Sequence, residues 1–347
     1  MIKNFLKNHS IHKDIVKYFD FLFLFNLPYF FVLFALFTWG MSASYYSKGM
    51  EEGYYFLLSI NVVDFIFFIS LFLFFSLMNI KLQIDDLLIL DWDSKDDEYK
   101  LDLNYLYVSP NFISIKKIKF LFSGSGRSII FFILALITYI SPYVLPVLIL
   151  YYILIIYFNV QFLNTNSYSD FIFRSIFKLI CFYLIFLSGW IYMNSIYNFL
   201  SILKYIPFFC LAVMPIILIN EIIFVDKFSN KEKENRQVIY KNRKRLALFS
   251  LIMMLILFFI SLKFHDPILT HFSIITIPFL LYAFVRSENK DFIRSYSYPI
   301  MTMNVLISWT LYPLLIIFQL FIYFLSKYYY WHRFDIHFPK FVVEENE

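Results

Sequence analysis

The chain has 347 residues, of which 61% are hydrophobic, 23% aromatic and only 16% charged. Soluble domains keep roughly a quarter of their residues charged, so this composition excludes an ordinary soluble protein and indicates a lipid solvent. The net charge of +5 does not indicate a nucleic-acid partner, because the basic residues flank apolar runs, as in membrane proteins. The runs are continuous rather than alternating, so we expect an all-α, polytopic membrane protein.

We expect about nine transmembrane helices in a single bundle, forming one integral membrane domain over residues 1–347. Several of the apolar runs reach the ~20 residues that cross a hydrocarbon core of ~30 Å. The predicted spans are Phe19–Trp39, Tyr54–Ile80, Phe120–Ile140, Tyr143–Phe158, Phe171–Met193, Ile202–Phe224, Leu246–Phe264, Ile268–Val285 and Met303–Leu325. The stretch "SGSGR" interrupts the start of the third span. Cys181 and Cys210 lie inside apolar runs and are interpreted as small hydrophobic side chains.

Basic residues concentrate in the loops after the second, fourth, sixth and eighth spans. The positive-inside rule therefore places the N-terminus and these loops in the cytoplasm, as expected for a bacterial inner (cytoplasmic) membrane protein. The two longest connections, residues 81–119 and 226–245, both lie on that side. Nine spans then leave the C-terminal tail on the opposite side.

A cluster of carboxylates follows the second span, in "DDLLILDWD". Asp86 and Asp93 are seven residues apart, which is two helical turns, so they share a face if the helix continues past Ile80. Asp85 lies one position before them. Like charges aimed at one point are tolerated when a divalent cation lies between them, which predicts a metal site. A solvated acidic loop remains the alternative.

A second polar cluster ends the sixth span, in "NEIIFVDKFSNKEK". Asn220 and Glu221 follow a wholly apolar run, and Asp226 comes five residues later. Ionisable groups at such depth are costly and therefore indicate a functional site. An interhelical polar contact remains the alternative for Asn220 and Glu221. The basic residues that follow would either neutralise a diphosphate or anchor the loop at the membrane.

The two clusters, with nine spans and long loops after the second and sixth, resemble the UbiA superfamily of intramembrane prenyltransferases. In that family the second helix ends in Asn-Asp-x-x-Asp-x-x-x-Asp, and Asp85, Asp86 and Asp93 fit this frame. Ile89 stands where the family has its middle aspartate.

The second family motif reads Asn-Glu-x-x-Asp-x-x-x-Asp and is matched here by Asn220 and Glu221, with Asp226 nearby. Phe224 and Phe228 stand at its two aspartate positions. The basic positions that hold the diphosphate in the family are matched by Lys233, Arg174 and Lys178.

The resemblance implies a Mg²⁺-dependent prenyltransferase that moves an isoprenyl group from its diphosphate to a lipophilic acceptor. One metal would be held by Asp85, Asp86 and Asp93, and a weaker second one by Asn220, Glu221 and Asp226. The alternative is a catalytically inactive relative that binds an isoprenoid or serves as a subunit of a membrane complex. A transporter has less support, since only "SGSGR" hints at a broken span.

Three further residues have open roles. Asp64 lies within the second predicted span, where a carboxylate should face the bundle interior, either in an acceptor pocket or in a helix-packing hydrogen bond. His265 and His271 flank the loop after the seventh span and would form a metal pair or remain structural. The acceptor, the prenyl chain length and the oligomeric state are not specified by the sequence.

Overall fold

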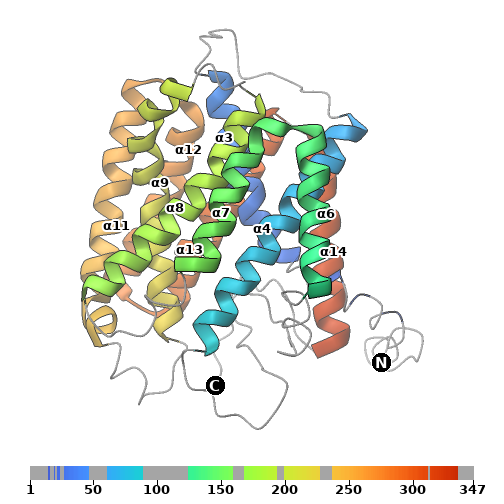
Figure 1. Ribbon diagram of the computed structural model, residues 1–347. Coiled ribbons are helices and arrows are strands. Elements are labelled where there is room, and N and C mark those ends of the chain that lie inside the picture. The colour runs from blue at the N-terminus through green and yellow to red at the C-terminus, as the bar shows by residue number, and fades with distance from the viewer. Residues whose placement is uncertain are drawn as a thin grey trace, which may run out of the picture. The chain divides into compact units, whose positions relative to one another are not determined.

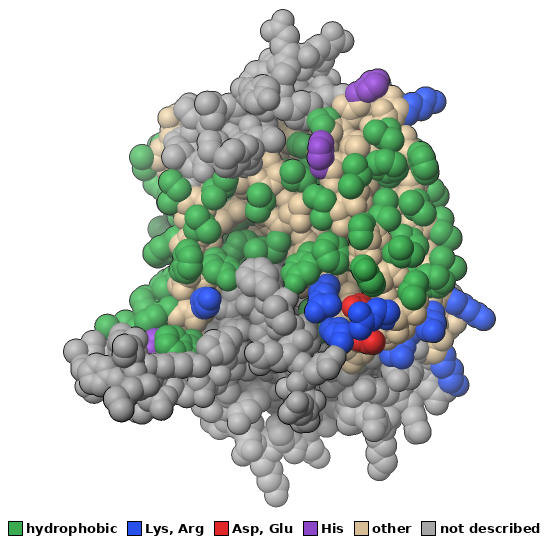
Figure 2. Space-filling model, turned by 180° about the vertical axis from the view of Figure 1, so that it is seen from behind, with side chains coloured by type: hydrophobic (Ala, Val, Ile, Leu, Met, Phe, Trp, Pro, Cys, Tyr) green, Lys and Arg blue, Asp and Glu red, His purple; other side chains and the backbone are tan. Residues whose placement is uncertain are grey.

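A computed structural model describes residues 15, 19, 22–23, 27–46, 61–88, 124–158, 168–193, 199–226, 237–311 and 313–334 (Figure 1). All regular structure in this part of the chain is helical, as the composition predicts. Hydrophobic side chains cover most of the described surface in the view of Figure 2. Such a surface is stable in lipid rather than in water, so the protein is a membrane-embedded helical protein.

The chain divides into two compact units. The first comprises Met1–Leu33, Ser59–Ile140 and Pro313–Glu347, and the second comprises Phe34–Leu58 and Ser141–Tyr312. Unit 1 contains η1 (Leu27–Tyr29), α4 (Val62–Leu88), α6 (Gly124–Ile140) and α14 (Pro313–Phe334). Unit 2 contains η2 (Pro142–Val144), α7 (Leu145–Phe158), α8 (Tyr168–Met193), α9 (Phe199–Asp226), α11 (Gln237–Lys263), α12 (Pro267–Arg286) and α13 (Asn289–Leu311). Helix α3 (Phe30–Tyr46) crosses the boundary between the units. One domain over the whole chain stays a prediction.

Five described helices are long and apolar enough to cross a membrane. Their apolar segments are Val62–Asn79, Phe171–Met193, Ile202–Ile223, Lys241–Lys263 and Pro267–Arg286. All five fall on spans that the hydropathy pattern predicts. Four shorter apolar segments, Phe30–Ser44, Arg127–Ile140, Pro142–Ile156 and Leu315–Tyr329, overlap the remaining predicted spans.

The structure divides one predicted span and sets the start of another. The predicted ninth span, Met303–Leu325, is not one helix, because α13 ends at Leu311 and α14 begins at Pro313. Proline has no backbone N–H and its ring clashes with the preceding turn, so it begins a helix more readily than it continues one. The "SGSGR" stretch does not break a helix within the described residues, since α6 begins inside it at Gly124 and continues to Ile140.

Helix α9 is the centre of unit 2, since it packs against α8, α11 and α13. Helix α12 completes the unit by packing against α11 and α13. Successive helices reverse direction, so α8, α11 and α13 begin at the end where α9 and α12 finish (Figure 1). We call this the basic end of unit 2; it carries Arg174, Lys178, Lys241, Arg286 and Lys290.

Aromatic side chains fill much of the space between α3, α8 and α9. The rings of Trp39 and Phe209 stack with their centroids 5.5 Å apart, and Phe186 meets Phe209 at 5.1 Å. Trp190, on α8, is among the largest fully buried side chains. These contacts account for many of the aromatic residues through packing alone, which is the most economical interpretation of such a composition.

Candidate functional site

A buried carboxylate lies at the basic end of unit 2. Glu221, on the last turns of α9, has 0% of its surface exposed and follows a buried run from Pro215 to Ile219. A charged group without partners would be very costly in this position. Its partners therefore define the site.

Two cations on α8 supply those partners. Nη2 of Arg174 donates to Oε2 of Glu221, and Nζ of Lys178 lies 2.5 Å from Oε1. Arg174 and Lys178 are four residues apart, so they project from the same face of α8. Both are largely buried, with 11% and 23% of their side-chain surface exposed. Each oxygen of Glu221 is thus held by a different cation.

The group carries a net charge of +1, because two cations surround one carboxylate. Buried ion pairs recover their desolvation cost only when geometry and hydrogen bonding are good. Arginine and lysine are the side chains that hold phosphate groups in proteins, so this pair of cations is suited to bind an anion. The sequence names all three residues as candidates, and the structure brings them together.

The arrangement suits an anion better than a metal ion at Glu221. Both carboxylate oxygens are occupied by cations, so a metal would have to displace Arg174 or Lys178. Among the described residues, no group of three or more His, Cys, Asp or Glu side chains is placed to hold a metal ion. Asn220 is half-buried next to Glu221, while Asp226 is the last residue of α9.

The first acidic cluster is described only in part. Helix α4 continues past Ile80 to Leu88, as the metal-site prediction requires, and it contains Asp85 and Asp86. Asp93 lies outside the described residues, and so does Lys233. Helix α4 belongs to unit 1, whereas Glu221 and its cations belong to unit 2. The metal site at Asp85, Asp86 and Asp93 stays a prediction.

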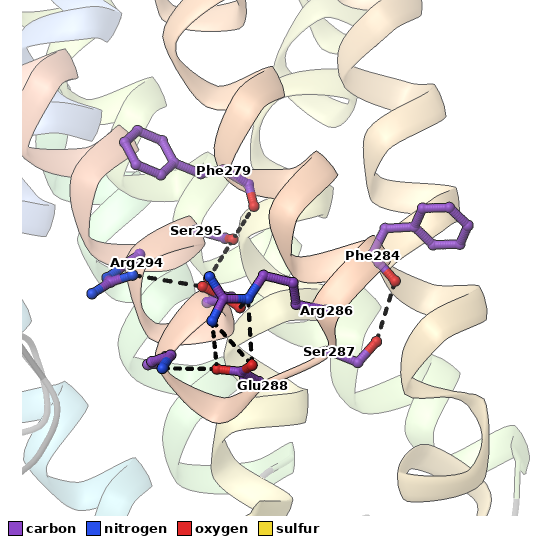
Figure 3. A network of polar contacts seen from close by, with 9 residues as sticks. Phe279, Phe284, Arg286, Ser287, Glu288, Arg294 and Ser295 are labelled. Carbon is purple, nitrogen blue, oxygen red and sulfur yellow. Dashed lines mark hydrogen bonds and ion pairs between the residues drawn. The ribbon is translucent and has the colours of Figure 1, made fainter. Parts of the chain in front are cut away.

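A second charged cluster at the basic end joins α12 to α13 (Figure 3). Arg286 contacts both carboxylate oxygens of Glu288 at 3.0 Å and Oδ2 of Asp291 at 3.4 Å. Lys290 also pairs with Glu288, at 2.9 Å, and Arg294 lies 3.7 Å from Asp291. Asp291 is 3% exposed, whereas Glu288 is open to solvent.

Two features of this corner fix its backbone. Ser287 adopts φ 55° just after α12, and Ser295 donates to the carbonyl oxygen of Phe279 at 2.9 Å. These contacts, together with the ion pairs, tie the two helices at the turn, so we interpret the cluster as structural. Arg286, Lys290 and Arg294 belong to the basic residues that follow the eighth predicted span, and the positive-inside pattern by itself does not indicate that they form a cluster. The charge alternation of "RSENKDFIR" is the signal that would have found the cluster.

Asp64 is at a helix start, not in the interior of a span. It stands in the first turn of α4, half-buried, and its Oδ2 accepts a hydrogen bond of 3.0 Å from the backbone N–H of Asn61. An acidic residue three positions into a helix that bonds back to the residue before the helix is a capping arrangement. The structure thus places Asp64 near the start of the predicted span, and its role in an acceptor pocket or in helix packing stays a prediction.

At the opposite end of unit 2, Asp266 caps α12. Its carboxylate accepts from the N–H of Leu269 at 3.1 Å and from the hydroxyl of Tyr205 at 3.0 Å. Burial raises the pKa of Asp266, and those two hydrogen bonds oppose the rise. His271 places Nδ1 2.6 Å from the carbonyl oxygen of Pro267, and His265 has φ 54°. The contact of His271 and the backbone angle of His265 belong to the structure of the turn. They do not support a metal site formed by these two histidines.

Comparisons with known proteins add no relative. No protein-family model matches the chain, and no curated protein and no solved structure does so either.

Proposed function

We propose that this protein binds an isoprenyl diphosphate at the basic end of unit 2 and transfers the prenyl group to a lipophilic acceptor, as UbiA-like proteins do. The observation that carries the proposal is the convergence of Arg174 and Lys178 on the buried Glu221. Nine spans, a cytoplasmic N-terminus and a bacterial inner membrane are part of the same proposal. They follow from the hydropathy and positive-inside arguments above.

In this proposal Arg174 and Lys178 bind the diphosphate oxygens, and Glu221 holds the two side chains in place between ligands. The guanidinium of Arg174 offers a planar pair of donors, and the ammonium of Lys178 offers a point charge. When the allylic C–O bond breaks, the electron pair leaves with the diphosphate, whose growing negative charge these cations stabilise. The carbocation is captured by the nucleophilic atom of the acceptor, which then loses a proton.

Magnesium enters the proposal at one place only. As the resemblance implies, Asp85, Asp86 and Asp93 would hold an ion that neutralises phosphate charge. At Glu221 the residues do not fit a second ion, since cations already occupy both oxygens. In this proposal Arg174 and Lys178 take over the charge neutralisation that a second ion provides in the family.

A non-catalytic isoprenoid-binding protein, or a subunit of a membrane complex, is the second candidate. Ile89, Phe224 and Phe228 replace three motif aspartates of the resembling family. The pairing of Glu221 with two cations favours the same conclusion, because it uses up a carboxylate that the family gives to metal. Binding of the diphosphate without turnover would establish this candidate.

The test is binding and turnover of radiolabelled farnesyl diphosphate by the purified protein in lipid nanodiscs, with and without Mg²⁺. Arg174→Gln and Lys178→Gln should each weaken binding about tenfold or more, the size expected for a charge-assisted hydrogen bond. Arg286→Gln is the matched control, since it removes a cation from the same end without touching Glu221. Asp86→Ala should abolish any Mg²⁺ dependence. Absence of diphosphate binding in the presence of Mg²⁺ would exclude the prenyltransferase.

A further inference from the structure

One face of α11 is exposed along its whole described length. It runs through Lys241, Lys244, Arg245, Leu248, Phe249, Ile252, Leu255, Ile256, Phe259 and Leu262. The spacing of three and four residues keeps these side chains on one side of the helix. The opposite side is buried, with Ala247, Met254 and Leu257 fully covered. The face changes from basic to apolar between Arg245 and Leu248.

The dimensions of this face match those of one headgroup layer and the hydrocarbon core below it. With a rise of 1.5 Å per residue, Lys241 to Arg245 covers about 6 Å along α11, close to the depth of one headgroup layer. From Arg245 to Lys263 the helix covers about 27 Å, close to the thickness of the hydrocarbon core. Lys263 is exposed and marks the opposite border.

The neighbouring helix has its border at the same level. Helix α12 packs beside α11 in the opposite direction, and its exposed face passes from Val285, 62% exposed, to Arg286. Figure 2 shows the result, with hydrophobic side chains over the middle and Lys and Arg side chains gathered along the lower edge of the described surface. Two helices therefore place cations at one depth beneath a common apolar surface.

The cations differ in how far they are compensated. Arg286, Lys290 and Arg294 contact Glu288 or Asp291 at the corner between α12 and α13. On α11, by contrast, Arg245 contacts the side-chain oxygen of Asn242 at 3.4 Å, and no carboxylate in the described part of the chain pairs with Lys244 or Arg245. Lys244 and Arg245 are therefore the cations of this border that no described carboxylate compensates.

We propose that Lys241, Lys244 and Arg245 form a binding surface for the headgroups of anionic phospholipids, with the lipid chains lying along Leu248, Ile252 and the apolar face beyond. The lipid phosphate would contact the basic side chains at headgroup depth while its acyl chains cover the exposed aliphatic and aromatic groups. Neutral headgroups lack the net negative charge that this surface attracts. The surface is separate from Arg174 and Lys178, so it does not depend on the proposed function.

The test compares phosphatidylglycerol and phosphatidylcholine as the probe lipids. The full-length protein is placed in nanodiscs of both lipids, and the lipids that stay bound after release into detergent are counted by native mass spectrometry. We expect the wild type to retain phosphatidylglycerol preferentially. Removing one charge near the membrane surface should reduce this preference about fivefold, and K241Q/K244Q/R245Q should reduce it about a hundredfold.

Lys263→Gln is the matched control, because it removes one exposed cation from the other end of the same helix. It should leave the preference within about twofold of the wild type. Equal retention of the two lipids by the wild type, or an unchanged preference in the triple variant, would overturn the proposal. Binding of inorganic phosphate that depends on the same three residues and matches the lipid in affinity would also overturn it, since the surface would then recognise a soluble anion. The three substituted side chains are exposed on one helix face, so the triple variant is expected to fold. Its thermal unfolding in phosphatidylcholine alone checks this.

Discussion

Gly40 of α3 and Gly189 of α8 lie at a close crossing of the two helices within unit 2. A Cβ atom added to Gly40 would come 2.0 Å from the carbonyl oxygen of Phe186, and one added to Gly189 would come 2.0 Å from that of Phe37. Real side chains do not approach a backbone atom so closely, so only glycine permits this crossing. Small residues serve the same purpose at other helix contacts in membranes.

We predict that Gly40→Ala destabilises the protein. The helices must move apart to admit the methyl group, and overpacking of this kind costs about 1 to 3 kcal/mol, more than alanine's gain of about 1 kcal/mol in helix propensity. Thermal unfolding in detergent measures the difference. Ser42→Ala, a half-buried change on the same helix that adds no atoms, is the control. A Gly40→Ala protein as stable as the wild type would show that the crossing is looser than the backbone positions indicate.

Glu221 should be more important for stability than an exposed glutamate in a similar charge environment. Glu221→Gln removes the counter-charge that Arg174 and Lys178 share in a mostly buried position, at a cost of about 3 to 5 kcal/mol. Glu288→Gln, which also removes a partner of two cations but at an exposed site, should have little effect. The comparison is made by unfolding in SDS titrations.

A third variant separates charge from packing at the same site. Replacing Arg174, Lys178 and Glu221 together by Met removes the whole ion group and should restore much of the stability lost in Glu221→Gln, because apolar groups replace buried pairs at little cost. It should also eliminate binding of farnesyl diphosphate. Stability below that of Glu221→Gln would mean that the group contributes to the fold by more than its charges.

The stability contributed by Asp266 should depend on pH. Burial raises the pKa of this carboxyl above its ordinary value of 3.8, so the folded protein binds a proton more tightly than the unfolded chain does. Its contribution to folding is therefore greatest below about pH 4 and falls as the pH rises through the folded-state pKa. Asp266→Asn, which keeps an oxygen for the N–H of Leu269, should remove that dependence.

The capping role of Asp266 can be tested independently of its charge. Asp266→Ala should be about 1 kcal/mol less stable than Asp266→Asn at all pH values, because neither side chain titrates and only the alanine variant loses the cap of the first turn of α12. Thermal unfolding of both variants between pH 4 and 8 gives the measurement. A pH profile of Asp266→Asn identical to that of the wild type would assign the dependence to another group.

Asp64 should act only on the start of α4. Asp64→Ala removes the acceptor for the N–H of Asn61 and should cost about 0.5 to 1 kcal/mol. Faster hydrogen exchange at Asn61 and its neighbours would accompany the loss, while binding of farnesyl diphosphate should not change. Val63→Ala, at an exposed neighbouring position, is the control. A change in ligand binding would instead support the acceptor-pocket interpretation of Asp64.

Sequence reasoning located several elements well and missed others for identifiable reasons. The segments Phe171–Met193 and Ile202–Ile223 were predicted almost to the residue, since long uninterrupted apolar runs leave little choice of structure. The break at Pro313 was overlooked because hydropathy averages over a proline. Asp64 was assigned to a membrane interior because apolar residues precede and follow Val62. Hydropathy therefore gave no sign that a helix begins at Val62.

The sequence by itself determined that the protein is surrounded by lipid, that it is helical, and where five apolar helices lie. Hydropathy is a local property that can be summed over neighbouring residues without knowledge of the fold. It also named Glu221, from its position after an apolar run, and Arg174 and Lys178, through a resemblance, without any contact between them. Only the tertiary structure decided that these residues meet, across 47 and 43 positions of sequence, and that Gly40 faces Gly189. Such meetings depend on the rotation and register of one helix against another, and side-chain packing sets both only when the whole unit is assembled.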